Sequence, residues 1–490
     1  MGDRLLRWMP PALVLVLFGW VAARAARPIS DPDDWWHLRL GNDLISQHSL
    51  AAPAHWSAYA TLTWVPTEPL PEIAAAYVDR WWGLPGLAVL YAASALVVVL
   101  TVYLTSRRFA SALPAAVTTV LVVLTTSASL SARPQLVSFV LLSVVVTAWL
   151  RTEQDHRVRW WLAPVVWVWS LCHGFWFIGA GYGVLFVAGF ALGRRMPRPV
   201  LLRQAALAVA SVAVVGLSPV GLGVLEAPFA VNSTAQYLQE WQRTDLTSPS
   251  ALGAIAMVLV VAGTWLASRR DVTWPRVLVL ASAALWTWYA GRTVAVAGVV
   301  MAPLCAVALE RLVHGREPQR TDQRTDQRTD RPTDRPAAEH ATRVEVVGLA
   351  VAAALATALV AVLAPTTSDR SGDVPLALDP QLDRLPAGSG VFNDYALGGW
   401  IRWRHPDLEQ YIDGLITPYS VSHVRGFALA TSMAPGWYRV VRDSGAPVAL
   451  LAQDSALATG LTGRGWVTLG SDAGYVLLAR PGNPADGTTG

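Results

Sequence analysis

Three carboxylates and a histidine stand close together near the start of the chain, beside two tryptophans, in the stretch DPDDWWH at residues 31–37. Carboxylates held close together repel one another, so that one pKa rises or a divalent cation binds between them. The pattern therefore predicts a general base, with Asp33 and Asp34 as the candidates. It equally predicts a metal site in which Asp31, Asp33 and Asp34 hold Mg²⁺ or Mn²⁺ and, through it, a phosphate.

A purely structural alternative exists for the same stretch. Asp33 or Asp34 could cap a helix over residues 35–46, and the two tryptophans could lie at a membrane interface. Such a cap accounts for one aspartate and for both tryptophans, but it leaves the cluster of three acids without an explanation.

Further ionisable side chains stand within or beside apolar stretches, where placing a charge is costly. They are Arg133, His173 and Arg292. The planar guanidinium of arginine can bind a phosphate or pyrophosphate group through two hydrogen bonds. The alternative without a functional role is that each arginine extends to a phospholipid head group at the membrane surface. Together with His37, we predict these three as a substrate- and phosphate-binding set. Glu240, which lies in a polar interval rich in acids and aromatics and suited to sugar binding, joins them.

The elements that must position these residues are membrane spans. The chain has 490 residues, of which 53% are hydrophobic and only 15% charged, and its mean hydropathy is +0.38. A soluble protein usually has about a quarter of its residues charged. The charges cluster in short islands between nearly uncharged runs, which have the length of a bilayer-spanning helix. The composition excludes a soluble enzyme and a disordered chain, and it indicates a polytopic membrane protein.

We expect about eleven spans. The run at 160–193 is too long for one helix, so we interpret it as two short helices that turn near His173-Gly174. Two short helices meeting there leave backbone groups unpaired, and these must lie in protein or line a wet cavity, which predicts that His173 faces the cavity of Asp33 and Asp34. The runs are 11–26, 83–104, 112–130, 134–150, 160–193, 200–217, 251–267, 274–291, 294–313 and 344–363.

The arginines orient these spans. All 38 basic residues are arginine, and most lie in alternate short loops, as the positive-inside rule requires when the N-terminus is cytoplasmic. This distribution differs from a nucleic-acid-binding stripe, so we expect no nucleic-acid partner. The same topology places Arg133, His173, Arg292 and the acidic cluster on the outer side of the plasma membrane. The first outer loop, 27–82, ends in an amphipathic stretch, 68–82, that is typical of an interfacial helix.

This organisation divides the chain into four parts. Residues 1–313 form the polytopic membrane domain, and 314–343 form a low-complexity cytoplasmic linker with a repeated Gln-Arg-Thr-Asp pattern. Residues 344–364 form the last transmembrane helix, and 365–490 form a small extracytoplasmic α/β domain. In this domain we expect strands at 390–393, 410–413, 448–453, 466–470 and 475–479, and helices at 398–404, 437–443 and 456–463.

The motifs resemble those of a large group of bacterial membrane proteins. The opening Asp31-Pro-Asp-Asp-Trp-Trp-His-Leu38 is similar to the first-loop signature of that group, and Val391-Phe-Asn-Asp-Tyr395 resembles its C-terminal motif. Shorter matches lie between them and after them, at Arg133-Pro-Gln135, His173-Gly174, Ser218-Pro-Val-Gly221, Glu240-Trp241 and Ile412-Asp-Gly414. The resemblance covers about residues 31–420. An asparagine usual before the His-Gly pair and an arginine usual after Asp-Gly are absent here, because Cys172 and Leu415 occupy those positions.

That group resembles the GT-C glycosyltransferases, which include protein O-mannosyltransferases, aminoarabinose transferases and oligosaccharyltransferases. The resemblance implies a membrane all-α fold, an inverting transferase, a polyprenyl-phosphate sugar donor and an acidic catalytic function on Asp33 or Asp34. We place Asp394, from the C-terminal motif, in the substrate-binding set. The acceptor is a glycan, lipid or protein, and membrane lipids are further partners.

Three functions compete. The first is transfer of a sugar from a lipid-linked phosphate donor to an acceptor at the outer face. The second is a transporter or flippase of lipid-linked glycans, but no repeat relates the two halves of the chain and the polar groups gather at one face, which favours the enzyme. The third is a non-catalytic cell-envelope assembly factor. No nucleotide-binding, zinc-protease or serine-hydrolase motif is present in the sequence.

Overall fold

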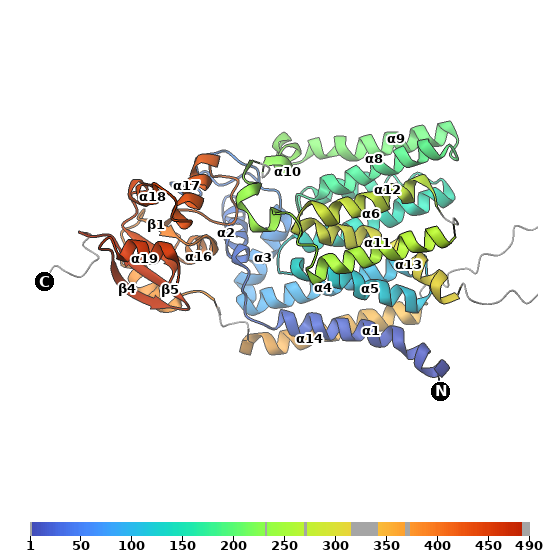
Figure 1. The fold of residues 1–490 in the computed structure, drawn as a ribbon, viewed down its shortest axis with the longest axis horizontal. Helices are drawn as coiled ribbons and strands as arrows, with labels where there is room; N and C mark the ends of the chain where they lie inside the picture. Colours follow the sequence, from blue (N-terminus) through green and yellow to red (C-terminus); the bar gives the residue numbers. More distant parts are fainter. Residues whose placement is uncertain (1, 231–232, 269–271, 315–341, 368–372, 483–490) are drawn as a thin grey trace, which may run out of the picture.

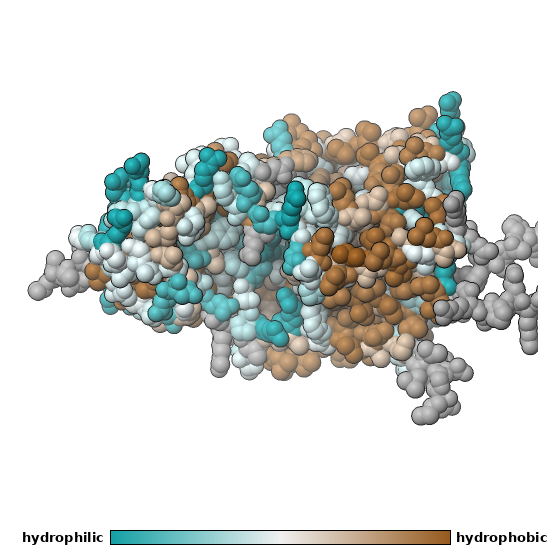
Figure 2. Space-filling view, viewed as in Figure 1, coloured by the Kyte–Doolittle hydropathy of each residue, from teal (hydrophilic) through white to brown (hydrophobic). Residues whose placement is uncertain are grey.

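The computed structural model describes residues 2–230, 233–268, 272–314, 342–367 and 373–482. A bundle of long helices forms one half of the molecule, and a small domain with a sheet forms the other half (Figure 1). Hydrophobic residues cover the visible side of the bundle, whereas the surface of the C-terminal domain is mostly hydrophilic (Figure 2). The distribution is that of a membrane domain joined to a water-exposed domain.

The bundle is the membrane all-α fold that the apolar runs predict. Within the described residues, nine helices are long and apolar enough to cross a bilayer. The other two expected spans correspond to shorter helices, of 8 and 16 residues, so the count of eleven stays a prediction. The helices of the bundle are α1 (Gly2–Ala25), α4 (Leu84–Ser106), α5 (Ala112–Thr126), α6 (Gln135–Asp155), α7 (Leu162–Trp169), α8 (Trp176–Gly193), α9 (Arg198–Ala213), α11 (Pro249–Ala267), α12 (Trp274–Tyr289), α13 (Val294–His314) and α14 (Arg343–Thr367).

Helix α13 lies at the centre of the bundle, where it contacts α5, α11, α12 and α6. Helix α14 lies at the periphery against α4 and α1 (Figure 1). The stretch at 160–193 forms two helices, α7 and α8, as its length predicts, and the chain turns between them at residues 170–175. The turn brings the buried side chain of His173 to the end of the bundle that faces the C-terminal domain.

Two helices of the first loop form a layer between the bundle and the C-terminal domain. They are α2 (Pro32–Ser46) and α3 (Pro69–Trp82), and they pack directly against each other. Gly41 allows the close approach, because a Cβ at this position would overlap the backbone carbonyl of Glu72. The start of α2 differs from the expected one. Asp31, rather than Asp33 or Asp34, is the N-cap, and its side chain accepts a hydrogen bond from the Asp33 amide at 3.1 Å.

The C-terminal domain contains a five-stranded sheet with strand order β2-β1-β3-β5-β4. Strands β2, β1 and β3 are parallel, while β5 runs antiparallel to both β3 and β4. The strands are β1 (Gly390–Asn393), β2 (Glu409–Gln410), β3 (Val448–Ala452), β4 (Val467–Asp472) and β5 (Tyr475–Ala479), and the helices are α15 (Asp379–Leu382), α16 (Gly398–Arg404), α17 (Val421–Thr431), α18 (Trp437–Asp443) and α19 (Ala456–Thr462).

The sequence predicted all five strands and three of these helices within a few residues, whereas α15 and α17 were not expected. The shortest strand, β2, begins at Glu409 and ends at Gln410, whereas residues 410–413 were expected. It ends early because the chain turns at Ile412-Asp413-Gly414 toward α2. Short helical segments elsewhere are α10 (Ala227–Ala230) and the 3₁₀ turns η1 (Ser127–Ser129), η2 (Val214–Leu217), η3 (Leu222–Leu225), η5 (Ala235–Tyr237), η6 (Gln239–Trp241), η7 (Gly291–Thr293), η8 (Leu376–Leu378) and η9 (Tyr395–Leu397).

Buried polar contacts join the C-terminal domain to the first loop. The carboxylate of Asp413 is fully buried and accepts hydrogen bonds from Trp56 Nε1 at 2.8 Å, Gln410 Nε2 at 2.9 Å and the Tyr419 hydroxyl at 3.0 Å. Helix α16 also packs along α2. A buried carboxylate that is satisfied by several donors fixes its surroundings. The domain and the first loop therefore form one continuous wall over the end of the bundle.

The ends of the bundle have different surroundings. The first residues of α1 lie at the end away from the C-terminal domain (Figure 1). Helix α14 runs from that same end toward the domain (Figure 1). The predicted cytoplasmic linker, 314–343, lies almost entirely outside the described residues. The orientation with a cytoplasmic N-terminus and an extracytoplasmic C-terminal domain remains a prediction from the arginine distribution.

Candidate functional site

A cavity of about 1370 Å³ lies where the bundle, the first loop and the C-terminal domain meet. Residues of α2 and α3, of the ends of the bundle helices and of the segment from β2 to α17 line it, and Gly414 of that segment lies directly against Asp33 of α2. Most of the side chains predicted from the sequence line this cavity. They are Asp33, His37, Arg133, His173, Glu240 and Arg292.

Three predicted residues lie elsewhere. Asp31 is the N-cap of α2 and pairs with Arg133 beside the cavity, and Asp34 is buried in α2 without lining it. Asp394 caps η9, where its side chain accepts a hydrogen bond from the Ala396 amide at 3.0 Å. The next residue, Tyr395, reaches the cavity instead.

Asp33 is held in the cavity wall by two contacts. Its carboxylate pairs with Arg133 Nη1 at 2.8 Å, and the Cα of Gly414 lies so close that a Cβ there would overlap Oδ1 of Asp33. Burial raises the pKa of Asp33 to about 6, although the neighbouring Arg133 opposes the rise. A carboxylate with this pKa is ionised at neutral pH and is a stronger base than an ordinary aspartate.

Arg133 is fixed by three carboxylates. Its Nε and Nη2 donate to the two oxygens of Asp31 at 2.7 and 2.8 Å, which is a bidentate pair. Its Nη1 contacts Asp33 at 2.8 Å and Glu240 at 3.2 Å. The hydrogen bonds from Arg133 lower the pKa of Asp31, although burial acts in the opposite direction. The guanidinium is therefore rigid before any ligand binds.

Arg292 lies opposite, in η7, and is held mainly by aromatic rings. Its guanidinium carbon lies 5.3 Å from the ring centre of Phe175 and 5.7 Å from that of Trp241. Its Nη1 pairs with Glu240, and within the described residues its buried Nε has no hydrogen-bond partner. Arg292 thus keeps donor capacity for a ligand in the cavity.

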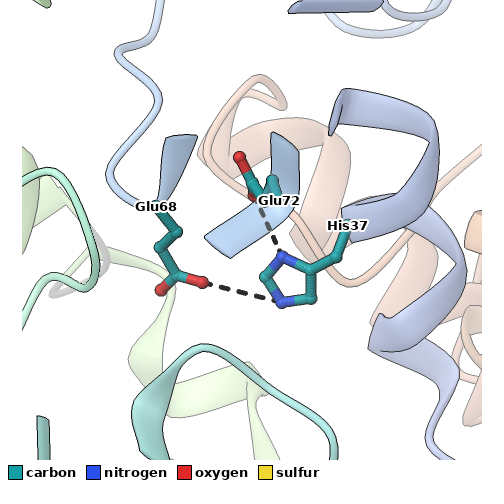
Figure 3. A group of neighbouring side chains, drawn as sticks. All are labelled: His37, Glu68 and Glu72. Atoms are coloured by element: carbon teal, nitrogen blue, oxygen red, sulfur yellow. Dashed lines mark hydrogen bonds and ion pairs between the residues drawn. The ribbon is translucent and has the colours of Figure 1, made fainter. Parts of the chain in front are cut away.

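A second group of side chains lies deeper in the same cavity, where His37 stands between two glutamates (Figure 3). Its Nδ1 lies 3.0 Å from Glu72 Oε1 and its Nε2 lies 3.6 Å from Glu68 Oε2. Burial raises the pKa of Glu68 to about 8 and that of Glu72 well above its usual range. Burial and the nearby Arg133 lower the pKa of His37 well below its usual range.

His173 connects this group to the bundle. Its Nδ1 contacts the Ser138 hydroxyl at 2.9 Å and the Phe175 amide at 3.2 Å. Because Ser138 accepts a hydrogen bond from Trp169 Nε1 at 2.7 Å, its own proton is free to point at His173. These donors make Nδ1 an acceptor, and Nε2 lies 3.4 Å from Glu68 Oε1 and 3.4 Å from Arg292 Nη2. His173 lines the same cavity as Asp33, as expected from the sequence.

The group around His37 has the donor set of a metal site. Among the described residues, the histidine and acidic side chains close enough to share one cation are His37, Glu68 and Glu72, whose ligand atoms lie within 4.8 Å of one another. Glu72 Oε2 is buried and has no hydrogen-bond partner there, so it has an unused acceptor. Nitrogen and carboxylate ligands fit Zn²⁺ or Mn²⁺ better than Mg²⁺. By contrast, Arg133 already pairs with two of the predicted ligands, Asp31 and Asp33.

Sequence reasoning did not single out Glu68, Glu72 or Tyr395. Glu68 and Glu72 were part of the amphipathic stretch at 68–82, which was interpreted from its apolar residues alone. A usable signal was present, because glutamates four residues apart share one side of a helix. For Tyr395, the motif gave two polar candidates, and the aspartate satisfies the local turn while the tyrosine extends away from it.

The fold, with its bundle, helical first loop and C-terminal domain, is similar to that of solved membrane transferase structures. The chain is similar to the oligosaccharyltransferase of Archaeoglobus fulgidus in its apo form, with a TM-score of 0.56 and 13% identity over 90% of this chain and 69% of that one. The complex of the same enzyme with Zn and sulfate gives a TM-score of 0.51 and 14% identity, over 95% of this chain and 73% of that one.

A further similar structure is ArnT from Cupriavidus metallidurans bound to undecaprenyl phosphate, with a TM-score of 0.48, 15% identity and coverage of 95% and 97% of the two chains. No family sequence model matches the chain, and no curated protein sequence matches it at a significant level. At these identities the likeness concerns the fold.

Proposed function

We propose that this protein transfers a sugar from a polyprenyl-phosphate donor to a hydroxyl-bearing acceptor at the outer face of the plasma membrane. The observation that carries the proposal is that Asp33, Arg133 and Arg292 line one cavity, in which Arg133 pairs with Asp33 and Glu240 bridges the two arginines. A base, a pair of cations for a leaving phosphate and an opening at the end of a membrane bundle are what such a transfer requires.

Each charged group has a distinct role in the proposed reaction. The ionised Asp33 accepts the proton of the acceptor hydroxyl as its oxygen forms a bond to the anomeric carbon of the sugar. The bond between that carbon and the phosphate oxygen breaks, and the polyprenyl phosphate leaves with the electron pair. Arg292 and Arg133 stabilise the charge that grows on the phosphate, more in the transition state than in the ground state. A single displacement of this kind inverts the anomeric centre.

A divalent cation has a place in this scheme. His37, Glu68 and Glu72 would hold it, and it would neutralise charge on the donor phosphate. Without a cation, Glu68 keeps its proton at neutral pH, because its pKa is raised to about 8, and it can donate a hydrogen bond into the cavity.

The part of the cavity that the C-terminal domain lines suits an acceptor that is uncharged where it touches the protein. Of the described residues in 365–490, those that line the cavity carry no charged side chain. Leu415, Ile416, Val424 and Phe427 give this part an apolar surface, and Thr417 and Thr431 add hydroxyl groups. We therefore expect the acceptor to be a neutral segment of a glycan, lipid or protein.

Cleavage of the donor tests this function. Purified full-length protein in proteoliposomes, supplied with the radiolabelled sugar lipids of a bacterial membrane and an envelope extract, is expected to release polyprenyl phosphate and to label an acceptor. Heat-inactivated protein supplies the background rate. Movement of intact sugar lipid between the leaflets without cleavage would contradict the transferase and support the flippase.

Substituting Gly414 by alanine is expected to displace Asp33, because the new Cβ would overlap its Oδ1. A displacement of about 1 Å at a reacting group can reduce the rate by about 100-fold. We expect a loss of transfer of ~10- to 100-fold with the melting temperature lowered by only a few degrees. The control is Gly426→Ala in α17, whose new Cβ would meet Val440 at an ordinary 3.6 Å. Equal activity of the two variants would show that Gly414 does not position Asp33.

A further inference from the structure

Glu240 occupies a position that an external anion would also fit. Its carboxylate bridges the two arginines of the cavity, with Oε1 on Arg292 Nη1 and Oε2 on Arg133 Nη1 at 3.2 Å. A carboxylate and a phosphate monoester present similar oxygens to a pair of guanidinium groups. The site between Arg133 and Arg292 is therefore an anion subsite that is filled by a side chain of the protein itself.

We propose that Glu240 is an internal competitor for this subsite, and that the phosphate of the ligand displaces it. That the ligand is a polyprenyl phosphate rests on the function proposed above, whereas the displacement itself applies to any phosphate that enters. Glu240 was predicted as a substrate-binding residue, and the two roles have opposite consequences. A binding residue raises affinity for the ligand, whereas a competitor lowers it.

The surroundings show which partner is free to move. Arg133 keeps both oxygens of Asp31 and one oxygen of Asp33 when Glu240 leaves. Arg292 stays flanked by the rings of Phe175 and Trp241. Glu240 lies in η6, a single 3₁₀ turn of three residues, and its side chain is 38% exposed, against 18% for Arg292 and 20% for Arg133. The carboxylate is thus the mobile member of the cluster.

Exchange favours the phosphate for two reasons. Polyprenyl phosphate is a monoester, which carries about −1.5 to −2 charges at neutral pH and three acceptor oxygens, whereas a carboxylate carries one charge and two oxygens. The sugar-bearing donor is a diester with one charge, and its phosphate gains the second charge when the bond to the sugar breaks. The unpaired Nε of Arg292 offers one more donor than Glu240 uses. The carboxylate of Glu240 would occupy both Arg133 and Arg292 and exclude other anions until a phosphate, with its additional charge, enters the cavity. Because the competing state lowers the fraction of protein ready to bind, its removal raises apparent affinity.

Binding measurements on the Glu240→Gln protein test this proposal. Glutamine keeps the size of the side chain and removes its charge. We expect full-length Glu240→Gln in nanodiscs to bind undecaprenyl phosphate at least ~10-fold more tightly than wild type, because an ion pair between close charges is removed. Inorganic phosphate, the second probe, is expected to bind more tightly by a similar factor, since the effect belongs to the phosphate and not to the lipid chain.

Two further variants make the result specific. Asp245→Asn removes a charge from the same polar interval, at a side chain that bonds only Thr247 in the hydrogen bonds we observe, and is expected to change neither affinity. Glu240→Ala is expected to follow Glu240→Gln, which separates the charge from any special property of glutamine. Melting curves of all variants verify folding.

Unchanged or weaker binding of both probes by folded Glu240→Gln and Glu240→Ala would overturn the proposal. Tighter binding of inorganic phosphate with no binding of the lipid by any protein would support the internal competitor and would contradict the polyprenyl-phosphate donor. The two failures are therefore distinguishable.

Discussion

Replacing Asp33 with asparagine is expected to lower the rate of sugar transfer by about 10³-fold while leaving donor binding within a few-fold of wild type. Asparagine has the same size and cannot accept a proton, and general-base catalysis contributes about 10²- to 10⁴-fold. The donor phosphate is held by Arg133 and Arg292, which the substitution leaves in place. The measurement is the single-turnover rate in proteoliposomes together with the affinity for undecaprenyl phosphate.

The adjacent aspartate gives a matched control. Asp34 does not line the cavity, and burial raises its pKa well above the usual range. Asparagine has the same size as aspartate, so the substitution changes no group that faces the cavity. We therefore expect Asp34→Asn to retain transfer within about 10-fold of wild type. A loss at Asp34 equal to that at Asp33 would show that the assignment of the base is wrong.

The pH dependence gives a second readout for Asp33. The pKa of this carboxyl is raised to about 6, and only the ionised form accepts a proton. The rate is therefore expected to rise as the pH increases through about 6 and to level off above about 7. In Asp33→Asn the residual rate should lack this rise. A wild-type rate that is flat between pH 5 and 7 would contradict the role of Asp33.

Replacing Arg292 with alanine is expected to have the second-largest effect, a loss of about 10²- to 10³-fold in kcat/KM. Removing one preorganised group that stabilises transition-state charge costs a factor of this size. The guanidinium lies between Phe175 and Trp241, a position that a planar group fits and an ammonium does not. We accordingly expect Arg292→Lys to recover only part of the rate.

Arg243→Ala is the control for this substitution. Arg243 also stacks on an aromatic ring, with its guanidinium carbon 5.3 Å from the ring centre of Trp288, but it does not line the cavity. The change removes the same charge and the same type of contact from the same end of the bundle. We expect transfer by Arg243→Ala to stay within about 2-fold of wild type. Similar losses in both variants would indicate a general electrostatic effect in place of a phosphate site.

The sequence predicted most of the site because the spans constrain it. Once alternate loops are assigned to one side, Asp33, Arg133, His173 and Arg292 must all lie at the same end of the bundle, and the structure places them in one cavity. The fold of the C-terminal domain was similarly accessible, because strands such as Val448–Ala452 and Tyr475–Ala479 are short apolar runs that directly follow a proline or a glycine.

What the sequence did not reveal depends on contacts between distant segments. Arg133, about a hundred residues away, pairs with both Asp31, the N-cap of α2, and Asp33, which lines the cavity. The group of His37, Glu68 and Glu72 forms only when α3 folds back against α2. Neither set of contacts is indicated by a local pattern in the sequence.

The position of the bound carrier lipid, which is the leaving group of the proposed reaction, tests the phosphate site most directly. The measurement is a cryo-electron microscopy structure of the full-length protein in nanodiscs that contain undecaprenyl phosphate. We expect density for the phosphate between Arg133 and Arg292, in the cavity that Asp33 lines. Density for the lipid head group elsewhere in the protein, with this cavity empty at saturating lipid, would contradict it.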